Sequence, residues 1–123
     1  MDRTFLLLAS VLGFFGVALG AFGAHALRSR LSPDMLAVFE TGVRYQMYHV
    51  FALLVVSAAI GHLGTARLLV LAGWSFVAGI LLFSGSLYLL TLGGMRALGA
   101  ITPIGGLAFL IGWALLALFA AAR

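Results

Sequence analysis

The chain has 123 residues, of which 64% are hydrophobic and only 8% are charged. This composition excludes a soluble domain of this size and indicates a protein that crosses a membrane several times. The net charge of +4 comes from seven arginines scattered along the sequence, so we expect no nucleic-acid binding. The chain has no cysteine, which excludes a disulfide, a thiolate metal site or a thiol switch.

Four apolar segments are each long enough to cross a bilayer, which takes about 20 helical residues. Short turns join the second segment to the third and the third to the fourth, so neighbouring helices should run antiparallel. We therefore predict an all-α polytopic membrane protein in which residues 1–123 form one up-down bundle of four transmembrane helices. The predicted helices cover residues 4–27, 45–61, 68–92 and 98–122.

The first segment carries four glycines at intervals of three or four residues, which places them on one face of a helix. Small residues let membrane helices approach closely, so this face should pack against a neighbouring helix or against another subunit. Similar small residues recur in the third and fourth segments. The residues predicted to pack in this way are Gly13, Gly16, Gly20, Gly23, Ser75, Gly79, Gly85, Gly105, Gly106 and Gly112.

The one long connection, between the first and second segments, contains a predicted amphipathic helix at residues 33–44. Ser32, Pro33 and Asp34 are typical of a helix start, because serine can cap a helix and proline suits its first position. At 100° per residue, the polar side chains fall on one arc of this helix and the apolar ones on another. We expect it to be continuous with, or kinked against, the second transmembrane helix.

Glu40 and Arg44 are one helical turn apart, in the order that favours an ion pair. Near lipid their mutual neutralisation would matter more than in water, because an unpaired charge there costs several kcal/mol. Tyr45 and His49, also one turn apart, can share a hydrogen bond. Three interpretations stay open: a solvated interfacial helix, a polar site or gate at the membrane boundary, and a face that docks a partner.

The two histidines His25 and His49 should lie on the same side of the membrane, at the end of the first segment and the start of the second. Two imidazoles could ligate a metal or haem, or relay protons. No third protein ligand is evident, so we expect no cofactor and no metal site. Ser84 and Ser86 have no acid or histidine on their own helix to act as a base, so we predict hydrogen bonds between helices and no catalytic residues.

Pro103 lies inside the fourth predicted helix, where it should cause a kink that fits the packing. In an antiparallel bundle, the end of the third helix and the start of the fourth reach the same membrane side as the long connection. Polar candidates should therefore gather there. They are His25, Glu40, Arg44, Tyr45, Gln46, Tyr48, His49, Ser84, Ser86, Tyr88 and Thr102.

Five motifs along the chain occur together in one order. They are Gly20–His25, Thr41–Gly42 followed by Tyr45, Gln46 and His49, Leu82–Tyr88, Thr102–Gly106 and Gly112–Trp113. In this order they resemble a domain-of-unknown-function family of small membrane proteins that includes bacterial YgdD and YwdK and eukaryotic transmembrane protein 256. The resemblance covers essentially the whole chain. It implies a four-helix protein of the bacterial inner (plasma) membrane with cytoplasmic termini, and it carries no activity, substrate or cofactor.

The function we predict is that of a non-enzymatic membrane protein that binds or supports a partner through its glycine faces and its polar end. The expected partners are the lipid bilayer and either further copies of the chain or another membrane protein. An alternative is a small-solute or ion transporter or channel with a polar vestibule at Glu40, Arg44, Tyr45 and His49. A third hypothesis is a haem, metal or quinone site that uses His25 and His49.

Overall fold

The computed structural model describes the backbone of residues 1–123 and every side chain except that of Ala24. Four stretches of helix are long and apolar enough to cross a membrane, which confirms the predicted all-α, four-span fold. A π-helical segment, η1, joins α3 to α4 within the third span, and a short 3₁₀ segment, η2, precedes α5. The elements in order are α1 (Asp2–Ala26), α2 (Pro33–Leu63), α3 (Arg67–Gly79), η1 (Ile80–Ser84), α4 (Gly85–Gly93), η2 (Arg96–Ala100) and α5 (Thr102–Ala121).

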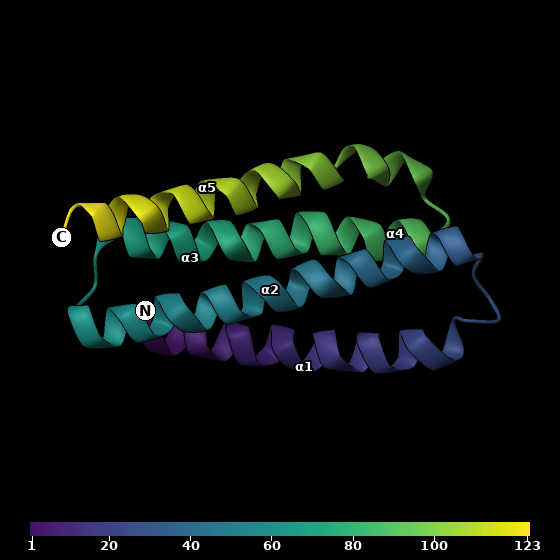
Figure 1. Ribbon diagram of the computed structural model, residues 1–123, viewed down its shortest axis with the longest axis horizontal. Coiled ribbons are helices and arrows are strands. Elements are labelled where there is room, and N and C mark those ends of the chain that lie inside the picture. The colour runs from purple at the N-terminus through teal and green to yellow at the C-terminus, as the bar shows by residue number, and fades with distance from the viewer.

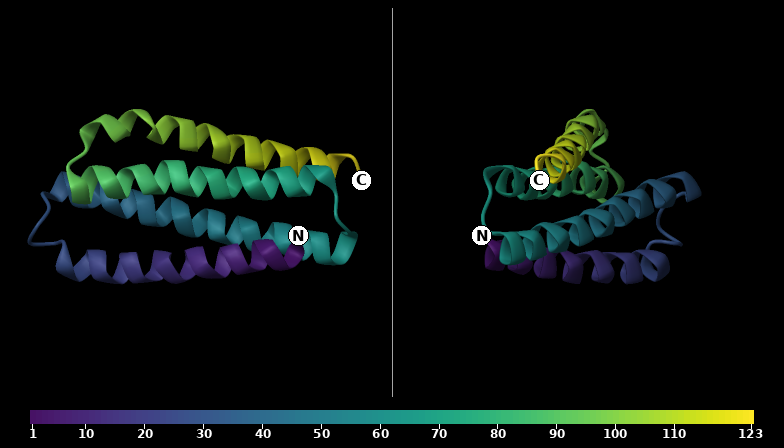
Figure 2. Two further views of the ribbon diagram at one scale, coloured as in Figure 1. Left: turned by 180° about the vertical axis from the view of Figure 1, so that it is seen from behind. Right: turned by 60° about the vertical axis from the view of Figure 1, so that its left-hand side comes forward.

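The helices form two antiparallel hairpins that meet along α2 (Figure 1). One hairpin consists of α1 and α2, and the other consists of the α3–η1–α4 helix and α5. Helix α2 contacts α3, η1 and α4 and is the main link between the hairpins, and Phe5 of α1 adds a contact with Gly73 and Trp74 of α3. Helices α1 and α5 lie at opposite edges of the bundle in both views of Figure 2.

Helix α2 begins where the sequence predicts a helix start. The Ser32 hydroxyl accepts a hydrogen bond from the Met35 backbone N–H at 3.2 Å, and Pro33 occupies the first turn. The helix then continues for 31 residues to Leu63. The predicted amphipathic segment and the second transmembrane helix are therefore one continuous helix, and Gly64, with a φ of 92°, ends it.

The glycine stripe of α1 packs against α2. A Cβ atom added at any of its four glycines would lie within 3.3 Å of an α2 side chain, so only glycine allows this approach. The facing residues, from the start of the stripe to its end, are Val50, Met47, Val43 and Phe39. The stripe thus serves the first hairpin of this chain.

Glycines also bring α5 close to the third span. A Cβ atom at Gly79 would overlap the ring of Phe109, and one at Gly112 would overlap the ring of Phe76. Two other predicted packing residues behave differently. A Cβ atom at Gly85 would meet no atom within 4 Å, and the Ser75 hydroxyl donates to the Leu71 carbonyl of its own helix at 2.8 Å.

Pro103 does not kink a helix, and that prediction was wrong. The chain turns at Gly94, whose φ is 67°, and passes through η2 before α5 begins at Thr102. Pro103 therefore lies in the first turn of α5, where its missing N–H needs no partner.

The neighbouring glycines of α5 give a matched test of backbone packing. A Cβ atom on Gly105 would lie 2.7 Å from Cα of Phe83, whereas one on Gly106 would lie 3.9 Å from the Phe83 ring. We expect Gly105→Ala to lower the free energy of unfolding by about 1–3 kcal/mol, because two backbones must separate. Gly106→Ala should be neutral or stabilise α5 by up to about 1 kcal/mol.

Thermal unfolding of the two variants in the same detergent, followed by circular dichroism, compares them directly. Equal stability of the two variants would contradict the close approach of α5 to η1.

Candidate functional site

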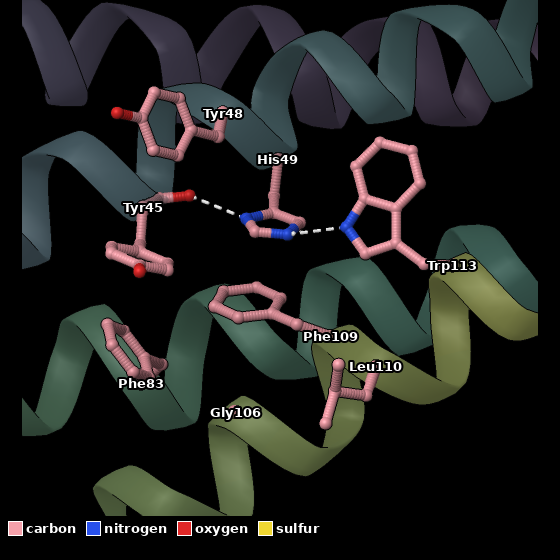
Figure 3. A pocket seen from close by; sticks show the side chains of 8 residues that line it. All are labelled: Tyr45, Tyr48, His49, Phe83, Gly106, Phe109, Leu110 and Trp113. Atoms are coloured by element: carbon pink, nitrogen blue, oxygen red, sulfur yellow. Dashed lines mark hydrogen bonds between the residues drawn. The ribbon is translucent and has the colours of Figure 1, made fainter.

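A pocket of about 420 Å³ lies between α2 and α5, beside η1. Its volume is within the range of small-molecule sites in proteins. Figure 3 shows that its side chains come from both hairpins and that aromatic rings form most of its wall. The lining residues are Tyr45, Tyr48, His49, Phe83, Gly106, Phe109, Leu110 and Trp113.

The pocket lies near the middle of the membrane and opens sideways. Tyr48 is the middle residue of α2, about 22 Å along the axis from either end of the helix. Tyr48 and Leu110 are 52% and 67% exposed, so the mouth of the pocket lies on the outer surface of the bundle. At this depth the medium outside is lipid hydrocarbon, which is about 30 Å thick.

His49 is a fully bonded, buried wall of the pocket. Its Nε2 atom accepts a hydrogen bond from Trp113 Nε1–H at 3.0 Å, and its Nδ1 atom lies 2.7 Å from the Tyr45 carbonyl oxygen (Figure 3). Because a carbonyl can only accept, Nδ1 carries the proton and the imidazole is neutral. The bond that the sequence suggested between Tyr45 and His49 therefore runs to the backbone of Tyr45 and not to its phenol.

Stacked aromatic rings hold His49 in place. The imidazole lies parallel to the Phe109 ring, with centroids 3.6 Å apart and an angle of 6°. Phe83 and Phe76 contact this pair from the third span. Gly79 and Gly112 make room for the rings of Phe109 and Phe76. The close packing of α3 and α5 thus fixes one wall of the pocket.

The π-helical segment η1 supplies Phe83 to the pocket and Ser84 to the neighbouring helix. The Gly85 N–H donates to the Ile80 carbonyl, five residues back, so this turn is wider than an α-helical turn, in which the bond spans four residues. The Ser84 hydroxyl donates to the Gly42 carbonyl of α2 at 2.6 Å. Such single π-helical turns occur frequently at functional sites.

A second polar cluster joins α1, α2 and α4. The buried Gln46 side chain donates from Nε2 to the Leu12 carbonyl at 2.7 Å and accepts at Oε1 from the Tyr88 hydroxyl at 2.6 Å. Ser86 and Thr102 share a hydrogen bond of 2.6 Å between α4 and α5. These bonds satisfy polar groups inside the bundle and hold the helices together, a common use of polar residues in membranes.

The charged residues predicted for the site, Glu40 and Arg44, lie outside the pocket. Glu40 and Arg44 are both exposed on the outer face of α2. They form no ion pair within 4.0 Å in the part of the chain that the structure describes, so the predicted pairing along the helix is not present. Of the four residues predicted to line a vestibule, only Tyr45 and His49 line the pocket.

His25 and His49 do not meet. His49 lies beside Val50, which faces Gly13 of α1, whereas His25 lies twelve residues further along α1, about 18 Å away along the axis. A joint site for metal or haem is therefore absent from this geometry. Within the described residues, no three His, Cys, Asp or Glu side chains gather to hold a metal ion.

Sequence reasoning missed most of the pocket wall that α5 supplies. Phe109 and Trp113 lie 60 and 64 residues from His49, so no local pattern links them to it. One signal was available, because the pocket residues of α5 follow the spacing of a single helix face. They are Gly106, Phe109, Leu110 and Trp113.

The fold and the pocket define a multi-pass, four-helix membrane protein with a laterally open aromatic site. Residues 19–106 match the sequence model of the family described as "Protein of unknown function (DUF423)". The chain belongs to this family, which confirms the resemblance inferred from its motifs.

Three relatives show how much of the chain the similarity covers. The UPF0382 membrane protein YwdK of Bacillus subtilis is 45% identical over 111 residues, which is 90% of each chain. A UPF0382 membrane protein of Haemophilus influenzae is 46% identical over 117 residues, 95% of this chain and 93% of the relative. The UPF0382 inner membrane protein YgdD of Escherichia coli is 41% identical over 118 residues, 94% of this chain and 87% of the relative.

No solved structure matches this chain. The relatives and the four spans together identify a multi-pass protein of the bacterial inner (plasma) membrane.

The hydrogen bond between Trp113 and His49 can be tested by a double-mutant cycle. We expect Trp113→Phe to lower the free energy of unfolding by about 1–3 kcal/mol, because it leaves Nε2 of a buried imidazole without a donor. His49→Phe should also destabilise, since it strands the Trp113 N–H. The double variant should lose less than the sum, because both partners are then apolar. Strictly additive losses in detergent unfolding would show that the two side chains do not interact.

Proposed function

We propose that this protein is a non-enzymatic binding protein that takes a lipid-soluble molecule from the bilayer into the pocket between α2 and α5. The supporting observation is the pocket itself: an aromatic-walled cavity of about 420 Å³ at mid-membrane depth, with its mouth toward lipid. A ligand could reach this mouth only through the hydrocarbon, so it must be apolar enough to partition there.

Two unpartnered hydroxyl groups favour a ligand with a polar end. Tyr45 and Tyr48 line the pocket, and neither phenol hydroxyl has a hydrogen-bonding partner among the residues that the structure describes. A hydroxyl without a partner is costly in hydrocarbon, where water cannot replace the missing bond. A ligand that carries a carbonyl, ether or hydroxyl oxygen would satisfy both tyrosines.

The aromatic rings favour a flat or chain-like apolar body. The exposed parts of the Phe83 and Trp113 rings offer surface against which a planar ring can stack, and the same surface suits an unbranched hydrocarbon chain. His49 adds no free hydrogen-bonding atom, because both of its ring nitrogens are already bonded inside the protein. In this proposal His49 positions the wall and does no proton chemistry.

Transport of a small solute stays a prediction for this chain. Glu40 and Arg44, which would have attracted a charged solute, lie outside the pocket. A binding role needs only the lateral opening, whereas transport also needs a route from the pocket to water on each side.

The test is native mass spectrometry of the protein purified gently from its membranes, with bound species identified by extraction. We expect one lipid-soluble molecule bound per chain. Gly106→Leu should abolish this binding, because a larger side chain then extends from a pocket-lining position. Gly106→Ala is the matched control, since its Cβ atom makes only ordinary contact with Phe83, and it should retain the ligand.

The tyrosines provide the second arm of the same experiment. Tyr45→Phe and Tyr48→Phe each remove one hydroxyl and should weaken binding by roughly threefold to tenfold, the range expected for one hydrogen bond. Protein that carries nothing small, or that keeps its ligand in the Gly106→Leu variant, would overturn the proposal.

A further inference from the structure

The outer face of α2 carries a pattern that the bundle leaves unused. Its residues are spaced alternately four and three positions apart, which is the seam spacing of a helix that packs against a parallel partner helix. All of them are exposed except Thr41, which is partly covered, and Tyr48 also lies at the edge of the pocket. The face consists of Ala37, Thr41, Arg44, Tyr48, Phe51, Val55 and Ala58, with Glu40 beside it.

Two charges on this face lie within the span. Arg44 is ten residues beyond Asp34, which marks the charged start of α2, so it lies about 15 Å further along the axis. Glu40 lies about 9 Å beyond Asp34 by the same rise. At the far end of the span, Asp2 lies beside Gly61 of α2. Hydrocarbon about 30 Å thick, centred between these ends, covers both Glu40 and Arg44.

Charges that face lipid need a partner. An unpaired arginine or glutamate inside the hydrocarbon costs several kcal/mol, and such residues usually face another protein surface. Neither Glu40 nor Arg44 has an ion-pair partner in the described part of the chain. A partner that covers this face therefore needs a negative group for Arg44 and a positive group for Glu40.

We propose that a second copy of this chain covers the face, with the two α2 helices packed in parallel about a two-fold axis along the membrane normal. Such an interface uses the same patch on both copies, so if Arg44 of one copy reaches Glu40 of the other, the reverse pair forms as well. Side chains on a helix lean toward its N-terminus, which directs Arg44 one turn back, to the level of Glu40 of the partner subunit. Two such pairs form a neutral cluster of four charges.

An anionic lipid fits the same face less well. Its headgroup would have to lie toward the membrane surface from Arg44, and that is where Glu40 projects, about 6 Å nearer the start of the helix. The carboxylate would repel the headgroup. A second copy supplies an arginine for the glutamate as well, so it satisfies both residues. This inference does not rest on the pocket or its ligand.

Single cysteines test the pairing without changing charge, because the chain has no cysteine of its own. Ala37→Cys, Phe51→Cys and Val55→Cys each place one thiol on the proposed interface. In oxidised native membranes we expect disulfide-linked dimers from this series, since thiols on the seam of two packed helices come within bonding reach. Phe14→Cys and Leu110→Cys are the controls, because both residues are well exposed on other helices.

The cysteine variants can either support or overturn the proposed α2 interface. Dimers from the α2 cysteines, with at most a tenth as much from the controls, would support the interface. Absence of dimers at all three α2 positions, or equal cross-linking of the controls, would overturn it.

Charge reversal tests the ion pairs and separates pairing between copies from pairing along one helix. Glu40→Arg alone places only positive charge on the face, and Arg44→Glu alone places only negative charge there. Each variant expressed alone should lose roughly tenfold or more of its dimer, because like charges then meet. Co-expressed and carrying different tags, the two variants should form mixed dimers at close to the original level.

Recovery in the mixed dimer cannot arise within one helix, because each helix then carries charges of one sign only. Failure of the mixed dimer to form, with both variants present in the membrane, would overturn the proposed pairs. An anionic lipid that co-purifies with a monomer and is lost in Arg44→Ala would assign the face to lipid instead.

Discussion

The side-chain amide of Gln46 ties three helices together in a region without water. It bonds to the Leu12 carbonyl of α1 and to the Tyr88 hydroxyl of α4, so all three helices have fixed rotations about their axes. In hydrocarbon no solvent can replace either bond, which makes the arrangement costly to leave. With Gln46 turned inward, His49 faces α5 and Arg44 faces outward. Both the pocket and the outer face of α2 depend on this orientation.

The polar groups of α2 differ in how fully they are satisfied. Among those facing the bundle, both ring nitrogens of His49 and both polar atoms of the Gln46 side chain take part in hydrogen bonds within the protein. Among the residues that the structure describes, the hydroxyls of Tyr45 and Tyr48 have no hydrogen-bonding partner, and Glu40 and Arg44 on the outer face have no ion-pair partner. Unsatisfied groups on a membrane helix indicate where something else must bind. On α2 they support the two sites that we propose, one for a small molecule and one for a second copy of the chain.

Local features of the sequence were predicted well. The four spans follow from the length of apolar runs, and the glycine stripe of α1 follows from its spacing, because both depend only on neighbouring residues. The start of α2 at Ser32 follows from capping chemistry. In contrast, the polar candidates were expected to form one cluster, and the structure divides them among the pocket, the internal network and the outer face of α2.

The parts that could not be predicted depend on contacts between distant residues. Nothing near His49 indicates that Trp113 is its donor, since that pairing depends on how α5 lies across the bundle. The π-helical segment could not be predicted from its composition, because its residues would suit an ordinary α-helix equally well. Pro103 was placed inside a helix because residues 98–101, just before it, have no charge and continue the apolar run of the fourth span.

The π-helical turn gives the third span a tolerance to the loss of one residue that its composition does not reveal. The turn accommodates one residue more than an α-helical turn would. Removing one residue from Ile80–Ser84 would turn this segment into an ordinary α-helical turn and leave the later residues facing as they do, so Tyr88 would still reach Gln46 and Ser86 would still reach Thr102. A deletion within an α-helical turn, in contrast, rotates everything after it by about 100°. The number of residues in this turn can therefore fall by one without moving the bonds of α4 to α2 and α5, whereas the side chains of Phe83 and Ser84 are tied to the pocket and to Gly42.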